Sequence, residues 1–184
     1  MGVVYEVRDQ RNSQRYALKH LRGELLEDER AWQAFLREAR LANRIGHPNV
    51  VRLFDSGADS TAGLFTVSEL IEGTSLEDDI RAWRQLGEPY PWPRMRSILL
   101  QICDALSAVH EAGVLHRDLK PNNILLRGQI EGSKDESPEV KVLDFGVSIL
   151  SDPTMTRLTM PGVFSGTPLY AAPEQIFGED LNER

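Results

Sequence analysis

The sequence has very little that would place it in an oxidising compartment, on a nucleic acid or in a membrane. Its single cysteine, Cys103, cannot form an internal disulfide, which fits a reducing compartment. The formal net charge is -7, and no basic run is present that could neutralise nucleic-acid phosphates. No apolar run approaches the roughly 20 residues of a membrane span, and the N-terminus lacks a signal-peptide pattern. We therefore expect a cytoplasmic chain without a membrane segment; an anchor outside these 184 residues would leave no trace in them.

The composition is that of an ordinary globular protein. Hydrophobic residues make up 41% and charged residues 27% of the chain, enough for one or two small cores. Short apolar runs bounded by polar turns predict strands at 3–7, 16–18, 50–54, 64–67, 124–126 and 140–143. Helical periodicity predicts helices at 27–45, 75–86 and 94–113, the second beginning at an N-cap serine, Ser75, and the third following an extended link through Pro89, Pro91 and Pro93.

One stretch carries most of the chemistry. Residues 116–123 read His-Arg-Asp-Leu-Lys-Pro-Asn-Asn, and Asp144-Phe145-Gly146 follows after a gap. Asp118 can take a proton from a hydroxyl, while Asn123 and Asp144 offer oxygen atoms to a metal ion. Together they form the acidic, metal-ready pocket that phosphoryl transfer needs.

Further motifs occur in a fixed order around this stretch. Lys19 ends Tyr-Ala-Leu-Lys, Glu38 lies on the first amphipathic helix, and Gly166-Thr167-Pro168 precedes Ala172-Pro173-Glu174. Each motif alone is weak. In this order and spacing, over roughly residues 2–176, the chain resembles the catalytic domain of a eukaryotic-type serine/threonine protein kinase and is most similar to bacterial members of that family.

The resemblance implies an α+β, two-lobed fold. Residues 1–70 would form a small, β-rich N-lobe without its first strand, and residues 71–184 the first part of a helical C-lobe, so the domain would be truncated at both ends. We expect these residues, expressed alone, not to form a working kinase, because the apolar face of 98–109 would lose its cover. Cys103 lies on that face and is predicted to be a small core residue. We interpret residues 127–139 as a tolerated surface insertion and 147–171 as a mobile activation segment.

The resemblance also implies residue roles. Asp118 would receive the proton of the substrate hydroxyl, Lys120 would lie beside the γ-phosphate, and Lys19 would align the phosphates. Asn123 and Asp144 would hold Mg²⁺. The implied contacts to ATP are Gly2, Val4, Ala17, Lys19, Glu38, Glu69, Ile71 and Leu125.

Two small residues stand at positions to which the family resemblance gives a role. Ser68 stands at the position that controls access behind the adenine site in the family, although an ordinary strand residue is an equally good interpretation. Ala42 stands where the family has a larger apolar residue, so we expect looser packing there.

A regulatory role is implied for Arg117, directly before Asp118. It would bind a phosphate on the activation segment, at Thr159 or, as second choices, at Thr156 or Ser165; the less favoured alternative is that these are merely polar loop residues.

The expected substrates are Ser/Thr hydroxyls of proteins, and two alternatives stay open. A pseudokinase or scaffold would bind nucleotide or partners without turnover. A small-molecule phosphotransferase would share the Asp, Asn and second Asp but would not be expected to have the segment from Gly166 to Glu174.

Overall fold

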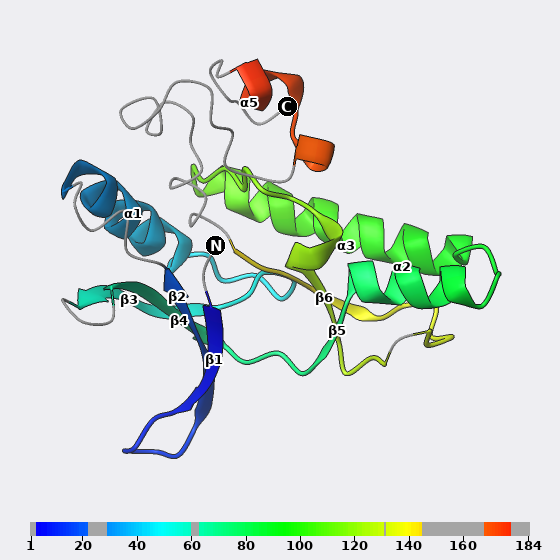
Figure 1. The fold of residues 1–184 in the computed structure, drawn as a ribbon, viewed down its shortest axis with the longest axis horizontal. Helices are drawn as coiled ribbons and strands as arrows, with labels where there is room; N and C mark the ends of the chain where they lie inside the picture. Colours follow the sequence, from blue (N-terminus) through cyan, green and yellow to red (C-terminus); the bar gives the residue numbers. More distant parts are fainter. Residues whose placement is uncertain (1–2, 22–28, 60–62, 131, 145–167, 178–184) are drawn as a thin grey trace.

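The computed structural model describes residues 3–21, 29–59, 63–130, 132–144 and 168–177. The described elements fall into two groups, one built on a four-stranded sheet with α1 and one built on α2, α3 and a three-stranded sheet (Figure 1). This is the predicted arrangement of a β-rich part followed by a helical part, although the exact boundary near residue 70 stays a prediction.

The first group is an antiparallel sheet in the order β1-β2-β4-β3, and its elements are β1 (Val3–Arg8), β2 (Arg15–Leu21), α1 (Glu29–Ala42), β3 (Leu53–Asp59) and β4 (Gly63–Glu69). The polar residues after β1 form the predicted hairpin turn, in which Ser13 has a φ of 61° and its amide donates to the Asp9 carbonyl. The third strand begins later than predicted. Val50 instead forms an isolated parallel bridge to Val142 of the other group.

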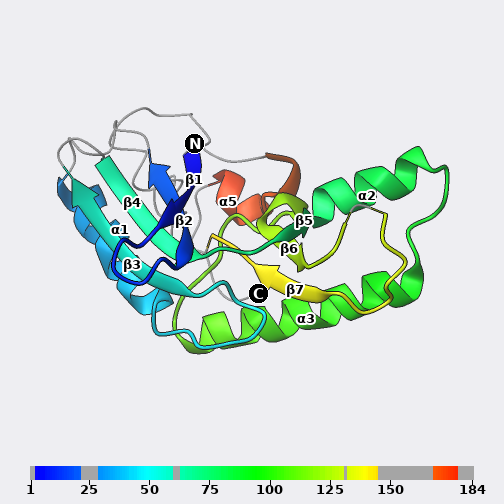
Figure 2. The same cartoon turned by 90° about the horizontal axis from the view of Figure 1, so that it is seen from below.

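The second group contains β5 (Gly73–Ser75), α2 (Leu76–Gln85), α3 (Trp92–Glu111), the 3-10 helix η2 (Pro121–Asn123), β6 (Ile124–Arg127) and β7 (Glu139–Val142), followed by η4 (Pro168–Tyr170) and α5 (Pro173–Phe177). Its sheet order is β5-β6-β7, and α3 runs along it (Figure 2). The Ser75 hydroxyl accepts from the Asp78 amide, which confirms the predicted N-cap. The predicted start of α3 is wrong, because the helix already begins at Trp92 and holds Pro93 in its first turn, where proline is tolerated.

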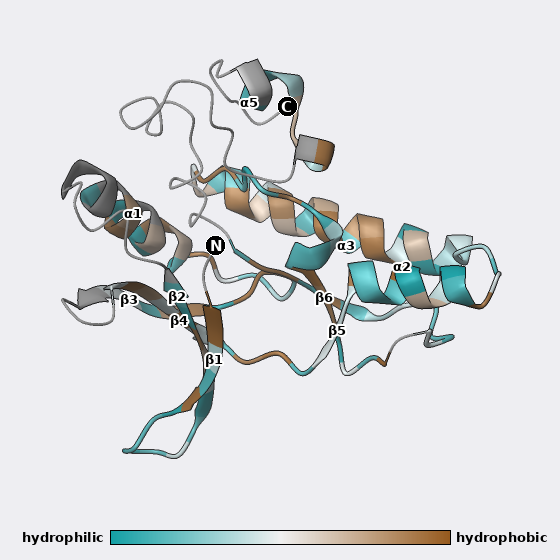
Figure 3. Ribbon diagram, viewed as in Figure 1, coloured by the Kyte–Doolittle hydropathy of each residue, from teal (hydrophilic) through white to brown (hydrophobic). Residues whose placement is uncertain are grey.

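A hydrophobic cluster joins the two groups. It includes Ala42, Ile45 and Val50 from the first group and the buried face of α3 with β6 and β7 from the second. The brown bands on α3 contrast with the mostly hydrophilic α2 (Figure 3). Among the described helices, none is long and apolar enough to cross a membrane.

The prediction for Cys103 is wrong: its side chain is exposed. The buried apolar residues of α3 are Ile98, Ile102, Ala105 and Val109, which lie three or four positions apart and so share one face. Leu99 and Leu100, which sequence analysis placed on the same wide face, are 45% and 51% exposed. The helix is therefore buried on one side only, and Cys103 lies outside that side.

The loop 127–139 is more firmly attached than a simple surface insertion. Its Gly132 amide donates to the Asp79 carboxylate at 3.1 Å, and its Asp135 carbonyl accepts from Arg94. Arg94 and Asp79 form an ion pair at 3.1 Å, with side chains 1% and 0% exposed. The described part of the loop thus closes over a buried charged pair between α2 and α3.

Candidate functional site

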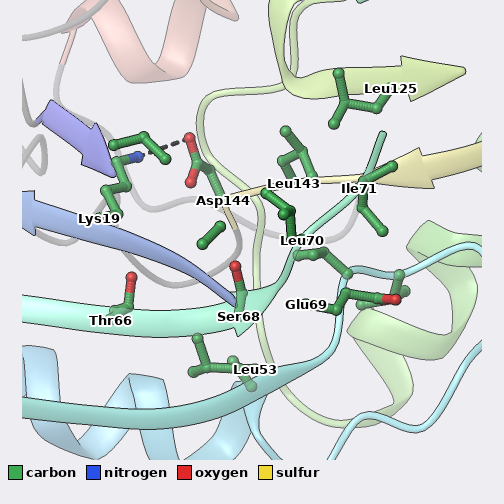
Figure 4. Close-up of a pocket in the computed structure, with 15 residues that line it drawn as sticks. Lys19, Leu53, Thr66, Ser68, Glu69, Leu70, Ile71, Leu125, Leu143 and Asp144 are labelled. Carbon is green, nitrogen blue, oxygen red and sulfur yellow. Dashed lines mark ion pairs between the residues drawn. The ribbon is translucent and has the colours of Figure 1, made fainter. Parts of the chain in front are cut away.

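A cleft lies between the two sheets (Figure 4). Its cavity volume is about 210 Å³, and its lining residues are Val4, Ala17, Lys19, Ala42, Val50, Val51, Leu53, Thr66, Ser68, Glu69, Leu70, Ile71, Leu125, Leu143 and Asp144. The lining is mostly aliphatic, with Lys19 and Asp144 together at one end (Figure 4). Such a cleft offers an apolar site for a planar base and a charged end for phosphates.

Strand register explains how these residues meet. On β1 and β2, Val4 lies opposite Lys19, and Lys19 lies opposite Thr66 of β4. Leu125 of β6 and Leu143 lie on the other side of the cleft (Figure 4). Residues as far apart in the sequence as Val4 and Asp144 are therefore brought to one cavity that lies between two separate sheets.

Most of the residues predicted to contact ATP line this cleft, namely Val4, Ala17, Lys19, Glu69, Ile71 and Leu125. Gly2 lies outside the described residues. The backbone of Glu38 is part of α1, but its side chain lies outside the described part of the chain. Ser68 also lines the cleft, next to the predicted adenine site, and so does Ala42.

Lys19 forms an ion pair with Asp144. The distance from Nζ to Oδ2 is 2.7 Å, and the two side chains are 23% and 31% exposed. Asp144 has a φ of 63°, a conformation uncommon for residues other than glycine, though less so for aspartate. The pair places one positive and one negative group together at one end of the cleft.

In residues 116–123, the predicted catalytic loop, two polar side chains contact Asp118. Lys120 Nζ lies 2.7 Å from Asp118 Oδ2, and Asn123 Nδ2 donates to the same oxygen at 3.1 Å. The same Asn123 amide donates to the Asp118 carbonyl at 2.8 Å. The Asp118 carboxylate is thus held by two neighbours and is still 30% exposed, so a substrate hydroxyl can reach it.

Asn123 is also tied to the segment that ends in Asp144. Its carbonyl accepts from the Leu143 amide at 2.8 Å. Because Leu143 directly precedes Asp144, this bond brings the two predicted metal-binding residues to neighbouring positions. With both Asn123 Nδ2 bonds directed at Asp118, its other amide atom is the oxygen, and Mg²⁺ prefers oxygen ligands.

The buried side chain of His116 supports the backbone of this loop. It is 4% exposed, and both its carbonyl, at 2.9 Å, and its Nδ1, at 3.3 Å, accept from the Asp118 amide. Burial lowers the pKa of His116 from the ordinary value of 6.5, although the charges of Asp144 and Asp118 act in the opposite direction. The neutral imidazole therefore acts as an acceptor for the backbone of the catalytic loop.

Arg117 connects the loop to the far end of the described chain. Its φ is 62°, and its carbonyl accepts from Gln175 Nε2 at 2.6 Å. The residues predicted to be phosphorylated, Thr156, Thr159 and Ser165, lie outside the described residues, as do Phe145 and Gly146.

Sequence reasoning missed two residues that contact this site. Lys141 is buried on β7, and its Nζ lies 3.0 Å from Glu69 Oε1 at the edge of the cleft. The sequence feature that could have identified Lys141 is the presence of a lysine inside the apolar run Val140–Leu143. Gln175 had a weaker signal, because it follows Ala172 by three residues as in a capping box but without the usual Ser or Thr.

Comparisons with known proteins point to one family. A family model described as "Protein kinase domain" matches residues 1–183. The chain is 40% identical to the serine/threonine-protein kinase pkn3 and 39% identical to the serine/threonine-protein kinase Pkn1, both of Myxococcus xanthus. All of the chain is covered in both cases, but it spans only 32% and 25% of the lengths of these relatives.

Solved structures show the same fold. The structure is similar to that of the Mycobacterium tuberculosis PknI kinase domain, with a TM-score of 0.73 and 24% sequence identity. The match covers 100% of this chain and 63% of the other chain.

Proposed function

This chain belongs to the protein kinase family, and we propose that it carries the catalytic residues for transfer of the γ-phosphoryl group of ATP to Ser/Thr hydroxyls of proteins. It corresponds to part of a Ser/Thr kinase domain. The observation that carries the proposal is the bond from the Leu143 amide to the Asn123 carbonyl. It joins the loop holding Asp118 to the strand end holding Asp144 beside Lys19.

ATP would bind in the cleft with its base between the two sheets. Val4 and Ala17 supply one apolar wall and Leu125 the other, while the strand end at Glu69 and Ile71 supplies backbone groups at the rim. Such pockets bind ligands through apolar contact area and a few polar groups that set orientation. The phosphates would then extend toward Lys19.

The side chains of this chain divide the chemistry among themselves. Asp118 would accept the proton of the substrate hydroxyl and hold its oxygen in line with the γ-phosphorus. Lys120, 2.7 Å from Asp118 Oδ2, would place a positive charge where the transferring group gains negative charge. Lys19 would orient the ATP phosphates.

Mg²⁺ fits the oxygen donors at this site. Asn123 Oδ1 and the Asp144 carboxylate would hold it, and it would neutralise charge on the phosphates. Among the described residues no cluster of three His, Cys, Asp or Glu side chains could hold a metal by itself.

Arg117 would add regulation. A phosphate on Thr159, Thr156 or Ser165 would gain a charge-assisted partner in its guanidinium and order the segment before Gly166. Mass spectrometry of active enzyme tests this directly, and an unmodified segment would contradict it.

The experiment for the main proposal uses the protein with its whole catalytic domain. Lys19→Met, Asp118→Asn and Asp144→Asn should each lower Mg-dependent transfer from labelled ATP to a protein substrate by orders of magnitude. Asp104→Asn, on an exposed position of α3, is the matched control and should keep the wild-type rate. Near-wild-type turnover in Asp144→Asn would remove the metal assignment.

Nucleotide binding, measured separately, distinguishes the alternative function. A pseudokinase or scaffold would bind ATP without transferring its phosphate in any variant. Phosphoamino-acid analysis of the product then tests the preference for Ser/Thr.

A further inference from the structure

Arg117 is held in a strained backbone turn immediately before Asp118. The Asp118 amide donates to the His116 carbonyl at 2.9 Å, and the residue between them, Arg117, has a φ of 62°. A hydrogen bond from residue i+2 back to residue i around a positive φ is the classic γ-turn, which is rare and strained. Such a turn is strained and persists only where neighbouring groups hold it.

The peptide group between Arg117 and Asp118 is held at both of its polar atoms. Its N–H belongs to Asp118 and closes the turn onto His116. Its C=O belongs to Arg117 and accepts from Gln175 Nε2 at 2.6 Å. Because this peptide plane leads directly into the Asp118 α-carbon, its orientation sets the direction in which the Asp118 carboxylate leaves the backbone.

Gln175 is itself held in place by a hydrogen bond at the N-terminus of its own helix, α5. Its Oε1 accepts from the Ala172 amide at 3.0 Å. Ala172 precedes Pro173, the first residue of α5, so this is the half of a capping box in which the N3 side chain reaches back to the N-cap amide. Glutamate would serve this cap equally well, because the cap needs only an acceptor.

The second bond is what requires glutamine. The Ala172 amide can only donate and the Arg117 carbonyl can only accept, so the side chain between them must present an acceptor and a donor at once. A carboxamide does so, whereas a carboxylate has no donor. The same two contacts also fix which end of the Gln175 amide is the oxygen.

We propose that Gln175 is a positioning residue for the phosphoryl-transfer reaction. It joins the segment that ends in Ala172-Pro173-Glu174 to the peptide group that orients Asp118. This inference rests on the proposed function, because Asp118 is the group that would receive the substrate proton. It assigns Gln175 no contact with ATP, in agreement with its absence from the lining of the cleft.

Two substitutions distinguish the bond to Ala172, which is the cap, from the bond to the Arg117 carbonyl, which we call the clamp. Gln175→Glu keeps the acceptor for Ala172 and loses the donor to Arg117, and it adds a negative charge in the first turn of α5, where the helix dipole favours it. Gln175→Met loses both bonds. If only the cap matters, the Glu variant behaves as wild type and the Met variant is impaired. If the clamp matters, both variants are impaired.

Steady-state kinetics of the protein with its whole catalytic domain provide the first readout. We expect kcat of Gln175→Glu to fall about ten- to a hundredfold, since misplacement of a reacting group by about 1 Å has effects of this size. The KM for ATP should stay within about twofold, because the cleft is unchanged. Gln129→Glu is the matched control, because Gln129 Nε2 donates to the Asp135 carboxylate in the surface loop. This substitution should leave both kcat and the KM for ATP unchanged.

Amide hydrogen exchange provides a readout that does not need turnover. Peptides covering 114–123 should exchange faster in Gln175→Glu than in wild type, while other regions exchange equally. Wild-type kcat in Gln175→Glu, together with unchanged exchange at 114–123, would overturn the inference. If the wild-type protein transfers no phosphate, the proposed function fails, and the exchange data alone decide whether Gln175 holds the loop.

Discussion

The ion pair between Lys141 and Glu69 should stabilise the edge of the cleft at which β4 ends. Lys141 Nζ lies 3.0 Å from Glu69 Oε1, and the two side chains are 8% and 21% exposed. Glu69 ends β4 and Lys141 lies on β7, so the pair joins the two sheets that enclose the cleft. The same Glu69 oxygen also accepts from the Arg52 amide at 2.8 Å. Removing either charge should therefore weaken the attachment of the end of β4 to β7.

The burial and distance set the expected size of the effect. At 3.0 Å and an effective dielectric constant of about 20, the attraction is about 5 kcal/mol. Desolvation of the two charges offsets most of that, which leaves a coupling energy of about 1–3 kcal/mol. Because Glu69 is partly exposed, we expect Glu69→Gln to lower the free energy of unfolding by about 2 kcal/mol, below the range for fully buried pairs.

A double-mutant cycle isolates this coupling. Glu69→Gln and Lys141→Met are made singly and together, and unfolding by urea is followed for each protein. The double variant should lose less than the sum of the single losses, because it leaves no unpaired buried charge. Glu69→Gln should also weaken the binding of a fluorescent ATP analogue about three- to tenfold, because Glu69 lines the cleft. This loss of affinity is equivalent to about 1 kcal/mol of binding free energy.

The pair between Arg127 and Glu139 is the matched control. It also involves β7, at 3.1 Å, but its side chains are 48% and 49% exposed and it joins neighbouring strands of one sheet. Glu139→Gln should cost less than about 1 kcal/mol and leave nucleotide binding unchanged. Equal effects of Glu69→Gln and Glu139→Gln, or a coupling energy below about 0.3 kcal/mol, would refute the reasoning.

Three further predictions concern stability. Asp79→Ala should lower the free energy of unfolding in urea by about 3–5 kcal/mol, because it leaves the buried guanidinium of Arg94 without its carboxylate; a loss below about 1 kcal/mol would contradict this. The free energy of unfolding should fall as the pH drops below 6.5, because the unfolded state is then protonated at His116 whereas burial lowers the pKa of His116 in the folded state. Thermal melts of His116→Phe at different pH values should lack this pH-dependent loss, and a pH profile identical to that of the wild type would contradict the prediction. Gly73→Ala should cost about 1–3 kcal/mol, because the added carbon would overlap a backbone carbonyl of β6, whereas Gly46→Ala has open space and serves as its control.

The local features of this protein could be predicted from the sequence. The hairpin turn after β1 and the N-cap at Ser75 depend on residues only a few positions apart, so short-range chemistry was sufficient. In the catalytic loop the contacts of Lys120 and Asn123 with Asp118 also span only two and five positions, but the sequence analysis assigned these two side chains to phosphate and metal and did not predict the contacts. Family resemblance supplied their proposed roles.

Periodicity failed where it could not say what packs on each face of a helix. The apolar residues of α3 predicted one wide buried face, but burial follows the strip from Ile98 to Val109 and leaves Leu99 and Cys103 exposed. A pattern shows which residues could be buried. Only the neighbouring sheet decides which of them are.

The contacts that complete the site were decided by the tertiary structure. Lys141 meets Glu69 across 72 positions, and Gln175 meets Arg117 across 58. Neither pair has a spacing rule, because each depends on how two separate elements pack against a shared core. Local patterns specify short-range hydrogen bonds and caps, whereas the partner of a distant charge or amide exists only once burial has brought the two backbones together.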